Sequence, residues 1–81
     1  MIFPIQIRAA RVLVGLGQEE LAALAGVGVG TIKRIEAAGK ELTGTAQTMA
    51  RIQRALEAKG IIFIDQDDKQ GPGVRLKKPL R

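Results

Sequence analysis

Two short apolar-patterned segments, separated by a turn that contains two glycines, restrict this fold more than any other feature of the sequence. The first segment, Gln18 to Ala25, and the second, Thr31 to Glu36, each repeat apolar residues at helical spacing. Their inward-facing residues are Leu21, Ala22, Ala25, Ile32 and Ile35. Because the turn from Gly26 to Val29 is tight, the sequence predicts two short helices packed against each other.

Two further helices flank this pair. Pro4 suits the first turn of a helix over residues 4–14, in which apolar residues recur at helical spacing. Thr45 can cap a helix over residues 45–59, and Gly60 terminates it. The apolar stripe of that helix is Met49, Ile52 and Leu56. We therefore predict four helices before Gly60.

The tail of the chain changes character. Residues 61–64 are β-branched and aromatic, residues 65–73 are rich in turn formers, and residues 73–77 alternate apolar with polar side chains. This pattern predicts a β-hairpin. Since an isolated two-stranded hairpin is marginally stable in water, it should pack on the helices or pair with a second chain. The predicted fold is mainly α, with a helical domain over residues 1–60 and a hairpin tail over residues 61–81 in the same compact unit.

The composition limits the chemistry that the chain can perform. It contains no Cys and no His, which excludes an ordinary zinc site, a thiol nucleophile and an imidazole acid–base pair. We therefore expect no catalytic residue, no metal and no cofactor, and a protein that is not an enzyme. No stretch approaches the roughly 20 apolar residues of a membrane helix. We accordingly expect a cytoplasmic protein without a membrane partner.

Charge and size point to partners. The chain has 13 Lys and Arg against 8 Asp and Glu, a formal net charge of +5. This balance favours a polyanion such as DNA, although ordinary solubility charge covers the same range, so the placement of the basic residues must decide. A chain of 81 residues without disulfides buries little surface, and a partner subunit is the common reinforcement. We predict a homodimer.

Several of these residues together resemble a known family. Arg11, the run Gly15 to Ala22, Ala25 to Val27 and the run Thr31 to Glu36 are similar to the phage repressor/Cro-type helix-turn-helix family, often called XRE. The resemblance covers about residues 7–56. The tail, with Gly60-Ile-Ile-Phe-Ile-Asp and Gly71-Pro-Gly-Val-Arg-Leu, is similar to short bacterial members that carry a β tail. The resemblance implies a four-helix repressor/Cro-like domain that binds double-stranded DNA and regulates transcription.

The family pattern assigns structural tasks to several positions. Ala22 has to be small where two helices cross, and Gly26 supplies a left-handed backbone, while Val27 and Ile32 close the core beneath the turn. A generic helical hairpin without DNA explains those four residues equally well. The resemblance further implies that Arg11 and Glu36 form a largely buried ion pair, which belongs to the scaffold and makes no DNA contact.

The resemblance also implies the DNA contacts. The base-facing positions are Val29, Gly30, Lys33 and Arg34, and the backbone-facing positions are Gln18, Thr31 and Lys40. Arg34 can bond guanine O6 and N7 together, Lys33 can reach a guanine or a phosphate, and Val29 can touch a thymine methyl group. Taken alone, Lys40 is better explained as a solvated surface residue.

Three glycines depart from the family pattern. Gly17 and Gly28 occupy positions that are commonly Ser or Thr, where a hydroxyl group caps a helix. Gly30 lies within the recognition helix, where glycine costs about 1 kcal/mol relative to alanine and offers no side chain to a base. Specificity is then expected to rest on few direct contacts together with DNA shape.

Two function classes remain open. The first is a dimeric regulator, a repressor on an inverted-repeat operator, whose hairpin holds the dimer either by edge pairing or by one of its faces. The dimerisation residues on that reading are Ile61, Phe63, Val74 and Leu76. The second is a protein-interaction module, of antiactivator or antitoxin-like type, that binds a regulatory protein through the β tail or through Val27 and Val29. Tight binding to a protein with only sequence-indifferent DNA binding would distinguish the second class.

Overall fold

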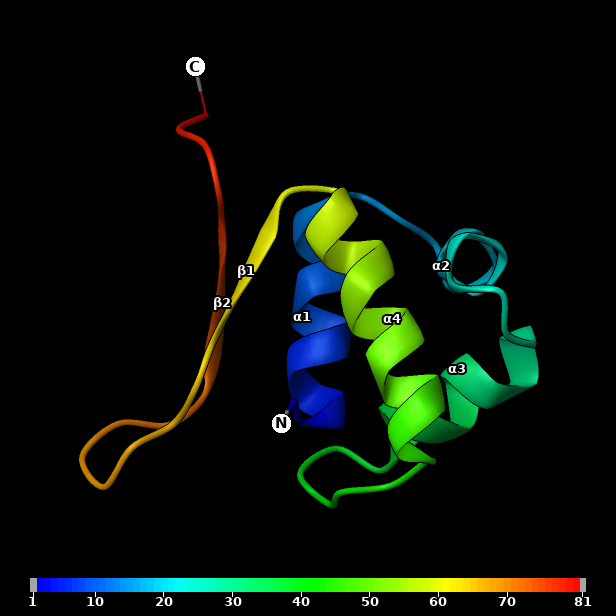
Figure 1. Ribbon diagram of the computed structural model, residues 1–81, viewed down its shortest axis with the longest axis horizontal. Coiled ribbons are helices and arrows are strands. Elements are labelled where there is room, and N and C mark those ends of the chain that lie inside the picture. The colour runs from blue at the N-terminus through cyan, green and yellow to red at the C-terminus, as the bar shows by residue number, and fades with distance from the viewer. Residues whose placement is uncertain (1, 81) are drawn as a thin grey trace.

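The computed structural model describes residues 2–80, which form four helices followed by one β-hairpin (Figure 1). The elements are α1 (Pro4–Leu13), α2 (Gln18–Ala25), α3 (Val29–Ala37), α4 (Ala46–Ala58), β1 (Ile61–Ile64) and β2 (Gly73–Leu76). The predicted mainly helical fold with a C-terminal hairpin is confirmed. None of the helices in this described range is long and apolar enough to cross a membrane.

Local sequence explains where the helices begin and end. Pro4 occupies the first turn of α1, and the Thr45 hydroxyl accepts a hydrogen bond from the Thr48 backbone N–H at 3.1 Å, which caps α4 as predicted. Gly26 ends α2 with a left-handed φ of 71°. The third helix begins at Val29, two residues earlier than predicted, because extended Gly28 serves as its N-cap even without a side chain.

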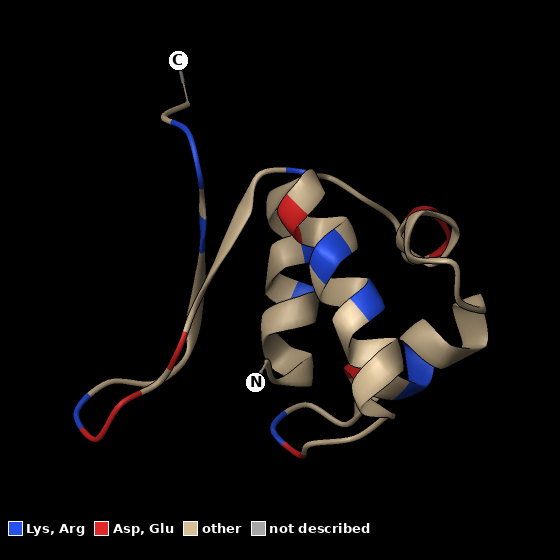
Figure 2. Ribbon diagram, viewed as in Figure 1, with Lys and Arg blue, Asp and Glu red and all other residues tan. Residues whose placement is uncertain are grey.

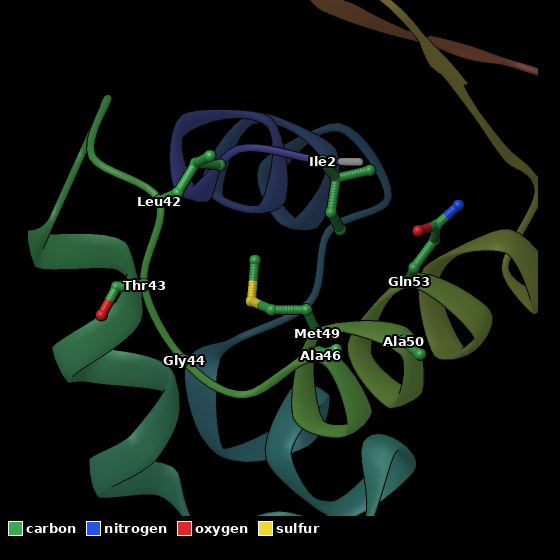
Figure 3. Close-up of a pocket in the computed structure, with 8 residues that line it drawn as sticks. All are labelled: Ile2, Leu42, Thr43, Gly44, Ala46, Met49, Ala50 and Gln53. Atoms are coloured by element: carbon green, nitrogen blue, oxygen red, sulfur yellow. The ribbon is translucent and has the colours of Figure 1, made fainter.

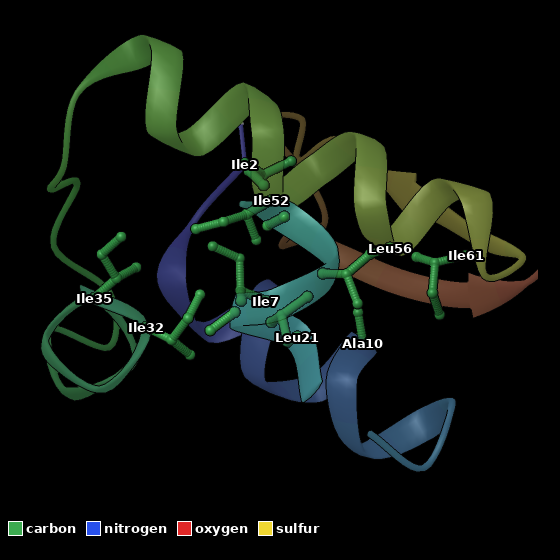
Figure 4. Packing of buried hydrophobic residues seen from close by; sticks show 11 residues of the cluster. Ile2, Ile7, Ala10, Leu21, Ile32, Ile35, Ile52, Leu56 and Ile61 are labelled. Carbon is green, nitrogen blue, oxygen red and sulfur yellow. The ribbon is translucent and has the colours of Figure 1, made fainter. Parts of the chain in front are cut away.

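The core collects one buried face from each helix (Figure 4). Its fully buried side chains are Ile7, Leu21, Ile32, Ile35, Ile52 and Leu56. Ala10 and Ala22 are also buried, as small residues between close helices must be. Met49 was predicted in the stripe of α4, but it is only half-buried at the margin of the core. The core therefore joins α3 to the other three helices.

The hairpin packs on the helices of its own chain. Its two strands are antiparallel, with Ile61 opposite Leu76 and Phe63 opposite Val74 on one face. That face is turned to the helices, where β2 contacts α1 and β1 contacts α4. Ile61 is buried and the other three are half-buried. The assignment of these four residues to a dimer contact stays a prediction; in the structure they pack on the helices of their own chain.

Gln6 joins the hairpin to α1, a role that the sequence does not reveal. Its side chain is buried, with an exposed fraction of 3%. The Nε2 amide donates to the backbone carbonyls of Ile64 at 3.2 Å and Gly73 at 3.0 Å, while Oε1 accepts from the Phe3 N–H at 2.7 Å. Both ends of the amide are thus satisfied inside the protein, and the turn end of the hairpin is fixed to the start of α1.

Candidate nucleic-acid interface

The turn between α2 and α3 is closed by backbone hydrogen bonds. The Val27 N–H donates to the Ala22 carbonyl at 3.0 Å, which completes the end of α2 beyond the left-handed Gly26. The Gly28 carbonyl then accepts from the N–H groups of Thr31 at 3.0 Å and Ile32 at 3.3 Å, which starts α3. The two helices pack directly on each other. This arrangement is a helix-turn-helix.

The outward face of α3 carries the base-facing residues that the family pattern assigned. Lys33 and Arg34 are exposed, and Figure 2 shows the basic segment that they form in α3. Val29 and Thr31 are half-buried at the start of the helix. A Cβ built on Gly30 meets no atom within 4 Å, so packing does not require this glycine. Lys33, Arg34 and the open surface at Gly30 thus lie on one helix whose opposite side is in the core.

An ion pair ties α3 to α1. The Arg11 guanidinium contacts both carboxylate oxygens of Glu36, with Nε–Oε2 at 2.8 Å and Nη2–Oε1 at 3.0 Å, and its Nη1 donates to the Leu16 carbonyl at 3.0 Å. The Glu36 side chain is 4% exposed and the Arg11 side chain 15%. The hydrogen bonds that Arg11 donates to Glu36, together with the negative charge of Glu36, raise the pKa of Arg11 against the opposing effect of burial. The pair is therefore bidentate and largely buried, and it fixes the last turn of α3.

Gln18 belongs to the same network. Its Nε2 donates to Glu36 Oε1 at 3.2 Å, so the amide that was predicted to reach a phosphate is directed at the ion pair. The reason is local, because the first residue of α2 lies beside the last turn of α3. Gln18 still begins α2, where backbone N–H groups without helical partners face outward.

A polar hollow lies where α1, α2 and α3 meet. It is lined by Arg8, Arg11, Gln18, Lys33, Glu36 and Ala37. Arg8, which sequence reasoning passed over, is exposed at its rim. The signal was available, because Arg8 and Arg11 are three residues apart and so share one face of α1. The hollow brings the cations of Arg8 and Lys33 to the N-terminal end of α2.

Lys40 lies apart from this hollow, in the loop after α3. It is exposed and adjoins Glu41, and Figure 2 shows both charges at the tip of that loop. The loop is held to the start of α1 by a hydrogen bond from the Ile5 N–H to the Gly39 carbonyl at 2.9 Å. Lys40 is therefore placed beside the C-terminal end of α3, away from the other predicted backbone contacts.

A separate pocket of about 360 Å³ lies between the same loop and α4 (Figure 3). It is lined by Ile2, Leu42, Thr43, Gly44, Ala46, Met49, Ala50 and Gln53. Figure 3 shows the Met49 side chain extending into it. Gly44 has a φ of +81°, and a Cβ there would lie 3.3 Å from Ile35 Cδ1. Because none of the described residues that line this pocket is charged, they offer nothing to hold a phosphate.

Comparison with known families agrees with this geometry. The model of a helix-turn-helix family matches residues 7–59, from α1 through the end of α4. Since the match covers more than half of the chain, the protein belongs to this helix-turn-helix family. It is a DNA-binding protein of the XRE type that acts in transcription regulation. Of the curated proteins, none matches the sequence significantly.

Proposed function

We propose that this protein recognises a specific operator through the outer face of α3, binds it as a homodimer on an inverted repeat, and represses transcription. The observation that carries the proposal is the contrast between the two sides of α3. Ile32, Ile35 and Glu36 are buried, whereas Lys33 and Arg34 are exposed. Because α3 is already ordered by its packing, its cationic face can enter the major groove without the entropy cost of ordering the helix on binding.

Each predicted contact has a physical task in this proposal. Arg34 makes the bidentate contact to guanine, and Lys33 bonds a neighbouring guanine or a phosphate. Val29 packs on a thymine methyl group, and Gly30 allows close approach to the base edges. The DNA-backbone contacts in this proposal are Gln18, Thr31 and Lys40, and we include Arg8 because it lines the same polar hollow as Gln18 and Lys33.

The tail leaves this face free. Figure 1 shows the hairpin on one side of α1 and α4, and α2 with α3 on the other side. Lys33 and Arg34 keep their exposure with the hairpin in place. The recognition face therefore needs no rearrangement of the tail before a duplex can approach.

Selection from a random duplex library with the full chain tests the proposal. The expected result is an enriched palindromic consensus whose half-sites lie about one helical turn apart. Arg34→Ala should bind the consensus and random DNA with nearly equal affinity, whereas Arg51→Ala, which removes an exposed arginine on α4, should keep the preference. Absence of any consensus at low salt contradicts the proposal.

A reporter assay tests the sign of regulation. With the selected operator placed over a promoter, transcription should fall when the protein is expressed and should recover with Arg34→Ala. A rise in transcription would contradict repression while leaving operator recognition intact. Tight capture of a protein together with sequence-indifferent DNA binding would instead favour the interaction-module function.

A further inference from the structure

One face of α1 is apolar and uncovered. The helix buries Ile7 and Ala10 in the core, but its other side leaves Ile5 46%, Val12 64% and Leu13 43% exposed. These side chains border a shallow groove between α1 and β2, lined by Ile5, Arg8, Ala9, Val12, Leu13 and Val74. A contiguous apolar surface beside a strand is characteristic of an interaction site.

The strand beside this groove has a free edge. The Lys77 N–H donates to the Gly60 carbonyl at 2.7 Å, which identifies Gly60 and Lys77 as a hydrogen-bonded pair of the ladder. In an antiparallel ladder such pairs alternate, so with the observed register the backbone groups of Val74 and Leu76 point away from β1. Within residues 2–80 no other group bonds to them. The outer edge of β2 can therefore accept another strand.

The hairpin carries opposite charges at its two ends. Its turn contains Asp65, Asp67, Asp68 and Lys69, all exposed, and is net negative, whereas the far end of β2 continues into exposed Lys77 and Lys78. Figure 2 shows acidic segments and one basic segment at the turn, and basic segments toward the C-terminus. If two copies of β2 lie antiparallel, each acidic turn meets the lysines of the other copy. In a parallel arrangement like charges would meet.

We propose that a second copy of this chain docks here, with β2 paired antiparallel to the other β2 and the two α1 faces in contact beneath a four-stranded sheet. A two-fold axis normal to the sheet produces this arrangement, because it keeps both α1 helices on the same side. The pairing also joins two two-stranded sheets, each of marginal stability alone, into one sheet of four strands. The inference rests on the proposed function, in which this dimer binds an inverted repeat, but the contact between the two copies requires no DNA.

The first test compares two matched variants. Val12 and Leu24 are both exposed apolar residues one position before the end of a helix, but Leu24 is on α2, away from the groove. Sedimentation equilibrium of the full chain without DNA should show a dimer. Val12→Glu should raise the dissociation constant of the dimer about 100-fold, because the two-fold axis places one buried glutamate from each copy in the interface. Leu24→Glu should leave this constant unchanged.

The second test reverses the charges. The variant with Lys77→Glu and Lys78→Glu and the variant with Asp65→Lys and Asp68→Lys should each dimerise about tenfold more weakly. Their equimolar mixture should recover wild-type affinity, because both contacts of the mixed dimer then pair opposite charges. Asp67 is left intact, since its Oδ1 accepts from two backbone N–H groups of the turn.

The control for this charge reversal is on α4. Arg51→Glu with Arg54→Glu changes the net charge as the lysine variant does, on residues that line no part of the groove, and should dimerise normally. Far-UV circular dichroism should show all variants folded.

Two outcomes overturn the docking surface. One is a wild-type chain that stays monomeric at millimolar concentration, and the other is an equal effect of Val12→Glu and Leu24→Glu. Failure of the proposed function is separate, because it concerns operator preference. Val12→Glu should still prefer a single half-site over random DNA, which tests recognition without the dimer.

Discussion

The third helix and the hairpin are attached to the same helical body in different ways. α3 contributes Ile32 and Ile35 to the core and ends in a bidentate, buried ion pair with α1. The hairpin buries only Ile61 completely, and Gln6 supplies its polar attachment. The comparison shows that α3 is attached to the helical body by more buried contacts than the hairpin is. The tail is held more lightly and keeps one edge open.

The largest expected effect comes from breaking the ion pair. Arg11→Ala should lower the free energy of unfolding by about 3 to 5 kcal/mol, because Glu36 keeps a buried charge without its partner. Urea denaturation measures the change. Replacing both partners, with Arg11→Met and Glu36→Leu, should restore most of the stability. If Arg11→Ala unfolds at the same urea concentration as Arg54→Ala, the control at an exposed arginine, then the ion pair does not stabilise the packing of α3.

The hairpin attachment should respond more weakly and more locally. Gln6→Ala removes the side-chain bonds to the carbonyls of Ile64 and Gly73 and should cost about 1 to 3 kcal/mol. Hydrogen exchange should speed up in β1 and β2 while the amides of α3 keep their protection. Gln47→Ala, an exposed glutamine on α4, is the matched control. Equal loss of protection in α3 would mean that the tail and the helices unfold as one unit.

Two glycines should change stability in opposite directions. Gly30→Ala should raise the free energy of unfolding by about 1 kcal/mol, because the added Cβ meets open space within a helix. Gly26→Ala should lower it by about 1 kcal/mol, because its φ of +71° is strained for any residue with a side chain. Thermal unfolding of both variants measures these two changes in stability. Destabilisation by Gly30→Ala would show a packing role at this position.

The smallest effect is expected in the turn of the hairpin. Backbone hydrogen bonds from Lys69, then Gln70, lower the pKa of Asp67. A carboxyl group with a depressed folded-state pKa contributes stability above its unfolded pKa, and that contribution is lost as the pH falls through the folded value. Asp67→Ala should therefore lower the melting temperature slightly at neutral pH and not at all in strong acid. A pH-independent difference would contradict this origin.

Sequence reasoning succeeded where the decisive interactions are local. The caps and glycine ends of the helices depend on residues a few positions apart, as the bond between Thr45 and Thr48 shows. The outward placement of Lys33 and Arg34 follows from the helical period. The sequence did not reveal that the helices of the same chain cover the apolar face of the hairpin, because alternation in a strand shows that one face is apolar without showing what covers it. Arg8 was missed because the polar hollow that it lines is formed with α2 and α3, which are distant from Arg8 in the sequence.

By itself the sequence determined the four helices, the tight turn between α2 and α3 and the hairpin, since helical periodicity, capping and glycine conformation act over a few residues. Only the tertiary structure decided the partners of Gln6, the direction of the Gln18 amide and the side of the hairpin that faces the helices. Those outcomes depend on which surfaces meet across tens of residues, and a polar side chain between two isoleucines, such as Gln6, carries no local sign of its partner.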